Sequence, residues 1–502
     1  MGRTVLHRIG INKKLDCRDT VVLNSHFDLF PVGKYRDYCD LHRFTVEVDC
    51  DGKVSSEIRV YREGCTETVL KSDSFGDDGI LAGFRITALE DCFVKSLCVA
   101  CEEEPKVVNL ALCICTYKLY GDVRKKVEAV KGLAKIYITD NGSALGKIDG
   151  AHVFPSPNYG GSTGFTNAMV EASKNEKITH FILNDDDASF DPEVLFRTKA
   201  FLGFCKKDVC ICGTMIDADD RHTVVESGAR FEGCELYPYD ANLDSDLLES
   251  NILMERKKDI HYGGWWYFVL SRETFEEAGL PLPLFIKMDD VEYGCRIKKE
   301  KITVCGISAF HKRFTAKYSP VNSYYYMRNL LTVGCITGRI GRHNLKKVIE
   351  KVYVEIACYR YLDAEMMIKG IEDFIKGPEY VLGLYKNGMI ECKMPELIPL
   401  DSFECEECVK PAGFLFRKLT LNGALLPSKG KVVRNVWDNH TEDFYRLKEV
   451  YFTTNGFEGF IMKKDVRKTF LFCYKIKKKQ IELKKTLSDV TSTGNEGFAL
   501  LL

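Results

Sequence analysis

The sequence has no excess of charge of either sign. Its 71 lysine and arginine residues are balanced by 72 aspartate and glutamate residues, so the net charge at pH 7 is −1. A chain without a global positive field has no general attraction for nucleic acid, and its partners have to be inferred from local features. We therefore predict no nucleic-acid partner.

Long hydrophobic runs and targeting signals are also missing. The longest apolar stretches, such as 107–117, are well short of the roughly 20 residues that a membrane-spanning helix needs. The N-terminal residues lack the apolar core of a secretory signal, and Leu6 stands where a myristoylation signal has Ser or Thr. We find no internal repeat or low-complexity tract. These absences lead us to expect a soluble protein, or one that visits a membrane surface.

Cysteine, by contrast, is frequent. The chain has 21 cysteines, an odd number, and many lie within apolar runs such as 112–115. With 502 residues the chain is large enough to fold without disulfides, so we expect reduced thiols and a cytoplasmic location. Cys405 and Cys408 form a C-x-x-C pattern with Cys392 nearby; a structural zinc there is an open alternative that lacks a clear fourth ligand.

The spacing of apolar residues predicts three domains. In 1–105, a run at 44–48 leads through Asp51-Gly52 into 54–61, which predicts a hairpin within an N-terminal β-sandwich of jelly-roll type. In 106–335, predicted strands alternate with predicted helices: strands at 107–115, 135–139 and 180–183, helices at 122–133 and 164–174. This alternation is typical of an α/β domain with a mostly parallel sheet and helices on both faces.

The third predicted domain, 336–502, is mainly helical, because apolar residues from Leu345 to Tyr359 recur at helical spacing. Its segment 463–485 is dense in lysine, with Ile476, Ile481 and Leu483 interleaved. Such a run is usually a solvated face, and the alternative is a patch that contacts anionic lipid.

Three consecutive aspartates, Asp185, Asp186 and Asp187, follow the apolar run 181–183. Adjacent carboxylates repel one another, and hard divalent cations are bound by one or two carboxylates together with substrate phosphates. Open α/β sheets bind ligands at the carboxyl ends of their strands. The pattern therefore indicates a metal–diphosphate site, with a solvated acidic turn as the alternative.

Three further segments have residue types suited to ligands. The glycine-rich stretch 158–164 precedes a predicted helix, where backbone N–H groups can approach an anion. Trp265 and Trp266 are adjacent, and because neighbouring side chains of a strand point to opposite faces, we expect at least one ring to be available to a sugar. The alternative buries one ring in the core and the other under a loop. Arg328 follows a tyrosine-rich segment and could meet a phosphate.

A second carboxylate pair, Asp289-Asp290, opens a predicted helix at 291–299. It could be a simple helix cap, or one buried carboxylate could act as a general base. His311 ends the apolar run 307–310. A lone histidine in that position is usually structural, although a neutral imidazole also suits manganese.

In this order the segments resemble family 2 glycosyltransferases of the GT-A fold, in particular the galactofuranosyltransferases that polymerise bacterial cell-wall galactan. The resemblance covers roughly residues 20–335. It rests on Cys115-Thr116-Tyr117, Asp140-Asn141-Gly142, Asn158 with its glycines, Asp185 to Asp187, Gly264-Trp265-Trp266, 281–287, Asp289-Asp290 with Glu292, His311 and Arg328-Asn329.

The resemblance implies a role for each of these residues. Asp185 and Asp187 would hold Mn²⁺ or Mg²⁺ with His311 as the third protein ligand, and Asp186 would support them or contact the nucleotide. Other donor contacts would come from Thr116, Asp140, Asn141, Asn158, Gly161 and Arg328. The sugar and the acceptor would be contacted by Trp265, Trp266 and Lys287.

Asp290 matches the general base of the family, with Asp289 and Glu292 beside it. The chain departs from the family pattern at Lys118 and Leu119, where family members have an arginine. We also expect the acidic triplet and Asp290 to share one cavity sized for an activated sugar.

The expected function is inverting transfer of galactofuranose from UDP-galactofuranose to a growing cell-surface glycan. The acceptor would be lipid-linked or polymeric, the protein would be peripheral at the inner face of the cytoplasmic membrane, and family members form symmetric oligomers. One alternative is transfer of another nucleotide sugar, such as rhamnose. Another is a non-catalytic carbohydrate-binding protein with calcium at Asp185 to Asp187.

Overall fold

The computed structural model describes residues 3–313, 318–454 and 458–492. The chain divides into two compact units, each of which is described by itself. The first contains residues 1–230, 236–280 and 293–312, and the second contains 231–235, 281–292 and 313–502. This division does not test the predicted domains, which are 1–105, 106–335 and 336–502 and stay a prediction.

The N-terminal part of the first unit contains two four-stranded antiparallel sheets. One has the order β1 (Thr4–Leu15), β8 (Cys92–Cys101), β3 (Arg43–Asp51), β6 (Ser74–Gly76), and the other β2 (Thr20–Leu23), β7 (Leu81–Ala88), β4 (Val54–Tyr61), β5 (Glu67–Leu70). Leu6 and Phe44 of the first sheet share a core with Ile58 and Phe84 of the second. Each sheet therefore buries one face.

The predicted hairpin between β3 and β4 is wrong. β3 pairs with β8 and β6, whereas β4 pairs with β7 and β5. The turn at Asp51-Gly52, where Gly52 has a φ of 112°, carries the chain from one sheet to the other. Alternating apolar residues specify which face of a strand is buried, but they do not specify its partner strand.

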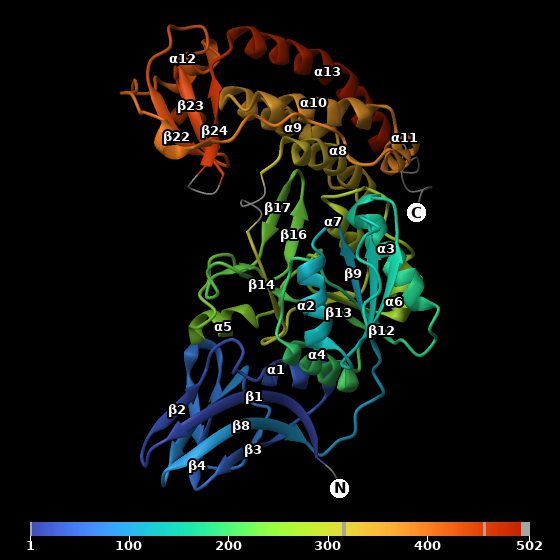
Figure 1. The fold of residues 1–502 in the computed structure, drawn as a ribbon, viewed down its shortest axis with the longest axis vertical. Helices are drawn as coiled ribbons and strands as arrows, with labels where there is room; N and C mark the ends of the chain where they lie inside the picture. The colour runs from blue at the N-terminus through green and yellow to red at the C-terminus, as the bar shows by residue number, and fades with distance from the viewer. Residues whose placement is uncertain (1–2, 314–317, 455–457, 493–502) are drawn as a thin grey trace. The chain divides into compact units, whose positions relative to one another are not determined.

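The centre of the first unit is a seven-stranded sheet with the order β11, β10, β9, β12, β18, β13, β19 (Figure 1). Its strands are β9 (Leu110–Thr116), β10 (Lys135–Asp140), β11 (Ala151–Pro155), β12 (His180–Leu183), β13 (Val209–Cys212), β18 (Phe268–Ser271) and β19 (Glu300–Ile302). Only β18 runs antiparallel to its neighbours. The predicted mixed α/β fold with a mostly parallel sheet is confirmed.

Both faces of this sheet are covered by helices. In β9, Leu112 and Ile114 belong to one hydrophobic core and Ala111 and Cys113 to another, which explains why this strand reads as a continuous apolar run. The first core is completed by α2 (Tyr120–Val130) and α4 (Pro192–Phe204), and the second by α3 (Gly160–Ser173).

Smaller elements complete the first unit. β20 (Ser308–His311) runs parallel to β14 (Thr214–Asp217), which pairs with β15 (Val224–Glu226). The remaining elements up to residue 296 are α1 (Val32–Lys34), a π-helical turn at Tyr35–Cys39, a 3-10 turn at Glu63–Cys65, β16 (Ala229–Glu232), β17 (Glu235–Pro238), α5 (Leu248–Met254), α6 (Arg272–Ala278) and α7 (Asp289–Arg296). Of these, β16, β17 and α7 also contribute residues to the second unit.

The second unit contains helices and a small sheet. Its helices after α7 are α8 (Pro320–Ile336), α9 (Leu345–Ala357), α10 (Tyr361–Ile375), α11 (Pro378–Gly383), α12 (Phe414–Leu419) and α13 (Val466–Ser492). A four-stranded sheet that the sequence did not predict has the order β21 (Ile398–Pro399), β24 (Glu458–Lys463), β23 (Glu449–Thr453), β22 (Lys431–Asn435). Across the residues that the structure describes, we find no helix with the length and apolar character needed to span a bilayer.

Candidate functional site

Three parallel strands of the central sheet end at polar side chains or directly before them. β9 ends at Thr116 and β10 at Asp140, which face each other in the pairing register, and β12 ends at Leu183, just before the acidic triplet. Because parallel strands have their carboxyl ends at the same edge of the sheet, the fold brings these residues together. The candidate site lies at this edge.

Asp185, Asp187 and His311 form a cluster there. Their ligand atoms all lie within 4.8 Å of one another, and His311 Nε2 is 3.1 Å from Asp187 Oδ1. An antiparallel bridge between Ser189 and Phe310 places the loop after β12 beside the end of β20 and so brings His311 to the aspartates. Two carboxylates and an imidazole are a ligand set that could hold a divalent cation.

The middle aspartate of the triplet is oriented differently. The Asp186 carboxylate accepts hydrogen bonds from Thr116 Oγ1 at 2.8 Å and from the backbone N–H of Tyr117 at 3.3 Å. These bonds turn Asp186 toward the end of β9 and connect the triplet to the neighbouring strand.

A lysine that sequence reasoning missed lies beside the triplet. Lys126 Nζ, on α2, hydrogen-bonds Asn184 Oδ1 and the carbonyl oxygen of Asp185. Burial lowers the pKa of Lys126 to about 8, while the carboxylates of Asp186 and Asp185 raise it. The cation explains how the fold tolerates three adjacent carboxylates, and no signal in the sequence separates Lys126 from the other lysines of its helix.

The predicted nucleotide-binding residues shape the loops at the same edge. The Asp140 carboxylate accepts hydrogen bonds from the backbone N–H groups of Gly142 at 2.9 Å and Leu145 at 2.6 Å. Asn158 Oδ1 accepts one from the Gly160 N–H at 3.2 Å, directly before the half-buried Gly161 in the first turn of α3. These bonds fix the loop after β10 and the start of α3.

Asn141 joins the two loops. It is 4% exposed, and its Nδ2 donates to the carbonyl oxygen of Gly160 at 3.0 Å. Within the described part of the chain, its buried Oδ1 has no hydrogen-bond partner. That oxygen is a candidate acceptor for a donor group of a ligand, because buried polar atoms without partners are rare.

The expectation that a tryptophan ring is available to a sugar does not match the structure. Trp265 and Trp266 are 4% and 3% exposed. Trp265 packs against Phe165 in the core on one face of the sheet, and Trp266 lies in the core on the other face, where its Nε1 donates to the Gly213 carbonyl at 2.8 Å. Side chains on opposite faces can both be buried because helices cover both faces.

The second carboxylate pair belongs to the second unit and starts α7. Burial raises the pKa of the Asp290 carboxyl to about 6, while a hydrogen bond from the Val291 N–H and the charge of Lys287 lower it. Glu292 is 1% exposed, and its carboxylate accepts a hydrogen bond from the Leu282 N–H at 3.1 Å. Asp289 is half-buried. A raised pKa suits a general base near neutral pH.

The loop before Asp289 has a strained backbone. Phe285, Lys287 and Met288 have φ values of 74°, 66° and 66°, in the left-handed region that favours glycine. Asn329 Nδ2 donates to the carbonyl oxygens of Leu284, Ile286 and Lys287 at 3.0, 2.9 and 2.9 Å. Strain of this kind persists only where surrounding contacts hold it, and it gathers at functional sites.

Arg328 takes part in the same arrangement. It is 2% exposed, and its guanidinium donates to the Leu284 carbonyl at 2.6 Å and to Asn329 Oδ1 at 2.8 Å. These donors are used within the protein, so the contacts do not support the predicted meeting with a phosphate.

The cysteines of the C-x-x-C pattern do not form a metal site among the described residues. Cys405 and Cys408 are exposed, and Cys392 does not join them in a group of three ligand atoms. A second group of potential ligands, His222, Asp244 and Asp246, is exposed.

No protein-family model matches the chain. Two curated proteins align with it, and both are glycosyltransferases, which identifies the chain as an enzyme of this class. They are galactofuranosyltransferases GlfT2, one from Mycolicibacterium smegmatis, 26% identical over 450 residues, and one from Mycobacterium tuberculosis, 28% identical over 262 residues. The alignments cover 77% and 47% of this chain, and 68% and 40% of the relatives. The resemblance predicted from the sequence is confirmed.

Solved structures resemble the chain only distantly. A mannosyltransferase from Pyrobaculum calidifontis, in complex with GDP-Man and Mn²⁺, is 11% identical with a TM-score of 0.30 over 46% of this chain and 63% of that chain. A mannosyl-3-phosphoglycerate synthase from Rubrobacter xylanophilus is 11% identical with a TM-score of 0.29 over 46% of this chain and 75% of that chain. Similarity of this degree supports no conclusion about this chain.

Proposed function

We propose that the protein is an inverting, metal-dependent galactofuranosyltransferase that uses UDP-galactofuranose and a hydroxyl of a growing cell-surface glycan. The observation that carries the proposal is the cluster of Asp185, Asp187 and His311 at the carboxyl edge of a mostly parallel sheet. The similarity of the chain to galactofuranosyltransferases GlfT2 supports the choice of donor. In this proposal the central sheet belongs to a GT-A catalytic domain, flanked by an N-terminal β-sandwich and a mainly helical C-terminal region.

Asp185, Asp187 and His311 would hold Mn²⁺ or Mg²⁺. These residues fit a divalent cation because they offer two carboxylates and an imidazole whose ligand atoms lie within 4.8 Å of one another. A bound cation would act as a Lewis acid that stabilises the negative charge developing on the leaving diphosphate. Lys126 would hold the loop of the triplet in place through its bond to the Asp185 carbonyl.

The nucleotide would lie along the ends of β9 and β10. Asn141 Oδ1 offers a hydrogen-bond acceptor there, and the N–H groups at the start of α3, near Gly161, favour an anion such as a phosphate. Thr116, Asp140 and Asn158 would hold the surrounding loops. Trp265 and Trp266 would form the packed wall behind the sugar, because both rings are buried.

Asp290 would act as the general base. The oxygen of the acceptor hydroxyl attacks the anomeric carbon, its proton passes to the Asp290 carboxylate, and the bond from the anomeric carbon to the diphosphate oxygen breaks on the opposite face. UDP leaves with the bonding electron pair, so the configuration at carbon inverts. A carboxylate with a pKa of about 6 is ionised at neutral pH and still basic enough to accept a proton.

The loop before Asp290 would present the acceptor-side residues. Asn329 and Arg328 hold the carbonyl oxygens of Leu284 to Lys287 and thereby maintain its strained backbone. We assign both as positioning residues, with Lys287 as the acceptor contact and Asp289 and Glu292 as supports for Asp290.

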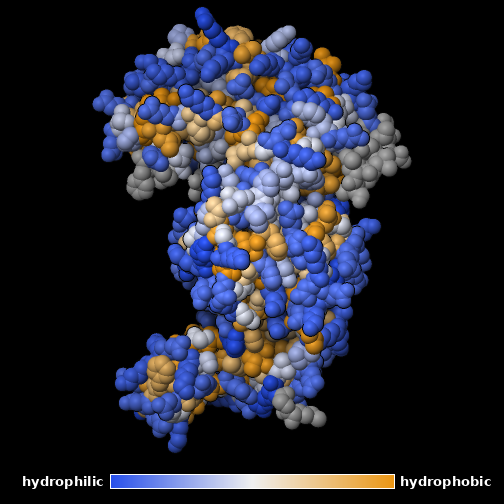
Figure 2. Space-filling model, turned by 45° about the vertical axis from the view of Figure 1, so that its right-hand side comes forward, coloured by the Kyte–Doolittle hydropathy of each residue, from blue (hydrophilic) through white to orange (hydrophobic). Residues whose placement is uncertain are grey.

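We also propose peripheral contact with the inner face of the cytoplasmic membrane, where a lipid-linked acceptor would lie. On the face in Figure 2, hydrophobic side chains lie among hydrophilic ones over the second unit. Phe414, Leu415 and Leu419 of α12 are 70%, 75% and 78% exposed, and Tyr474 and Ile481 of α13 are 68% and 74% exposed beside several exposed lysines. Apolar side chains set among lysines are typical of helices that lie on anionic membranes.

The proposal is tested by release of nucleoside diphosphate from a panel of UDP-galactofuranose, UDP-galactopyranose and a nucleotide-linked rhamnose, each with Mn²⁺ and a galactofuranose-containing acceptor. We expect release from UDP-galactofuranose alone, and only when the acceptor is present. Release from the rhamnose donor instead would assign the chain to another sugar. Binding of glycan without turnover of any donor would favour a carbohydrate-binding protein and contradict the proposal.

A further inference from the structure

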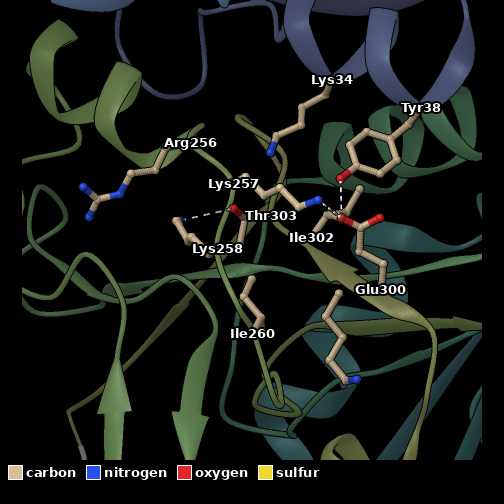
Figure 3. Close-up of a pocket in the computed structure, with 10 residues that line it drawn as sticks. Lys34, Tyr38, Arg256, Lys257, Lys258, Ile260, Glu300, Ile302 and Thr303 are labelled. Atoms are coloured by element: carbon tan, nitrogen blue, oxygen red, sulfur yellow. Dashed lines mark hydrogen bonds and ion pairs between the residues drawn. The ribbon is translucent and has the colours of Figure 1, made fainter.

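The charged groups around a small polar pocket of the first unit pair with one another (Figure 3). Lys34 Nζ lies 3.9 Å from a carboxylate oxygen of the buried Glu255. Glu300 accepts a hydrogen bond from Tyr38 Oη at 2.9 Å and lies 3.9 Å from Lys257 Nζ. These pairs offset one another's charge, so the pocket supports no ligand site.

A buried tyrosine of the second unit connects two segments that are far apart in the sequence. Tyr325, on α8, is 2% exposed, and its ring stacks on that of Phe285, with centroids 4.9 Å apart and an angle of 14° between the planes. Its hydroxyl accepts a hydrogen bond from the Ile390 N–H at 3.1 Å and donates one to the Gly388 carbonyl at 3.5 Å. The ring thus contacts the loop with the strained backbone, and the hydroxyl contacts residues 388–392, which we call the strap.

The strap also packs on apolar side chains of the strained loop. It belongs to an irregular stretch, 388–397, between α11 and β21. Ile390 packs against the hydrophobic cluster that contains Phe285 and Tyr325, whereas Met389 is 48% exposed. The strap therefore lies at the surface of the unit, with one of these neighbouring side chains directed inward and the other outward.

The same face of α8 carries the residues that hold the carbonyl oxygens of the loop. Arg328 and Asn329 follow Tyr325 by three and four positions, a spacing that places helical side chains next to one another. The Arg328 guanidinium lies 5.0 Å from the centroid of the Tyr325 ring. Phe285 has a φ of 74°, and such a backbone persists only where surrounding contacts hold it. The stack on Tyr325 is one of these contacts, and the strap fixes the far end of that ring.

We propose that Tyr325 is a positioning residue of the transfer reaction, which couples the strap to the loop that carries Lys287 and precedes Asp290. The strap holds the Tyr325 hydroxyl, the ring holds Phe285, and the loop presents Asp290 to the acceptor. Small displacements of a catalytic group are costly, so a loosened strap lowers turnover and leaves the donor site unchanged. The coupling is a property of the free protein, whereas the effect on turnover rests on the proposed function.

Hydrogen exchange of the full chain without ligands tests the coupling. Tyr325→Phe keeps the ring and removes only the hydroxyl, and we expect amide exchange to become about fivefold faster in the strap and severalfold faster in 284–290, as for loss of a hydrogen bond that closes a local unit. Ile390→Ala leaves Tyr325 intact and removes the apolar contact of the strap, and it should speed up exchange in 284–290 as well.

Two matched controls should leave exchange in the loop unchanged. Tyr359→Phe also removes a buried hydroxyl of the second unit, since Tyr359 is 2% exposed and donates to the Leu447 carbonyl at 3.2 Å, outside the loop and the strap. Met389→Ala alters the strap at its exposed side chain.

Steady-state kinetics with UDP-galactofuranose test the consequence for turnover. In Tyr325→Phe and Ile390→Ala, kcat should fall by about fivefold to tenfold, while the KM of the donor and the affinity for UDP in Mn²⁺ stay unchanged. The controls should keep full turnover. If Tyr325→Phe does not fold, Ile390→Ala decides alone.

The inference is overturned if exchange in 284–290 is the same as in the wild type, if turnover stays normal, or if the affinity for UDP falls as much as kcat. A wild-type chain that transfers no sugar would contradict the proposed function and with it the role in turnover. In that case faster exchange in 284–290 would still support the coupling of strap and loop, so the two failures are told apart.

Discussion

At the scale of single residues, the candidate site is a balance of charges. Ligand atoms of Asp185 and Asp187 lie close to His311, whereas the Asp186 carboxylate accepts a hydrogen bond from Thr116. The Lys126 ammonium donates a hydrogen bond to the carbonyl oxygen of Asp185. Lys126 offsets part of the repulsion among these carboxylates, and the proposed divalent cation would offset more of it.

Replacing one ligand should weaken nucleotide binding only when the metal is present. We expect Asp187→Asn to reduce the affinity for UDP in Mn²⁺ by about tenfold or more, since it removes a charged ligand that contacts His311 Nε2 at 3.1 Å. Calorimetric titration with UDP, with and without Mn²⁺, measures this. The control is Asp149→Asn, an exposed aspartate of the loop after β10. Equal losses in both variants, or an unchanged affinity in Asp187→Asn, would remove the metal-ligand assignment.

Asp290 should control the pH dependence of transfer. The base acts when it is deprotonated. As the pH increases through about 6, kcat/KM should therefore increase, and it should be low at more acidic pH. Asp290→Asn should lower kcat by about 10²–10⁴-fold, the usual contribution of a positioned base, and leave UDP binding intact. An Asp290→Asn enzyme with normal turnover and the same acid limb would rule out this role.

At the scale of elements, the strained loop from Leu284 to Met288 depends on α8. Asn329→Ala should leave the carbonyl oxygens of Leu284, Ile286 and Lys287 without their donor and let the loop relax. We expect kcat to fall by about tenfold or more with little change in the KM of the donor, because small displacements of a catalytic group are costly. Asn387→Ala, an exposed asparagine of the same unit, is the control.

Steady-state kinetics together with UDP titration test this assignment. A loss of kcat in Asn329→Ala with unchanged UDP binding supports a positioning role. A fully active Asn329→Ala enzyme would show that the loop does not need this contact.

The exposed faces of α12 and α13 allow a test of membrane contact. Leu415→Glu combined with Ile481→Glu should reduce binding to anionic vesicles several-fold without unfolding the chain, since these side chains are 75% and 74% exposed. Leu247→Glu, at a 52% exposed leucine of the first unit, is the control. Vesicle binding that survives the double substitution would exclude these faces. Deletion of 463–485 is a poorer test, because Phe472, Ile476 and Leu483 of α13 are buried.

Elements that follow one period were predictable from the sequence, whereas those that depend on distant partners were not. The alternation of strands and helices from β9 to β12 could be predicted because the apolar residues of each segment recur with the spacing of a strand or of a helix. The pairing of β3 and β4 was not, because alternation leaves the partner strand unspecified. The sheet of β21 to β24 was missed because its strands are short and because β21 pairs with β24, which lies far from it in the sequence.

The same division holds for the site. The triplet at Asp185 was visible as a local pattern at the end of an apolar strand. His311 was noticed at the end of another apolar run, and the resemblance assigned it as a metal ligand. Lys126 and Asn329 were missed as supports because their partners lie far away in sequence, at Asn184 and at Leu284 to Lys287. The burial of both tryptophans depends on helices that cover the two faces of the sheet, which no local pattern reveals.

At the scale of the whole molecule, the chain leaves the first compact unit and returns to it. The metal ligands belong to the first unit and Asp290 to the second. Because residues 293–312 return to the first unit, no simple truncation separates the two, and the function has to be tested on the full chain.

The most direct measurement is UDP release by the full chain from UDP-galactofuranose and a galactofuranose acceptor, in Mn²⁺ and in excess EDTA. The proposed role of Asp185, Asp187 and His311 predicts release in Mn²⁺, almost none in EDTA, and recovery when Mn²⁺ is added back. Equal release in EDTA and in Mn²⁺ would contradict it.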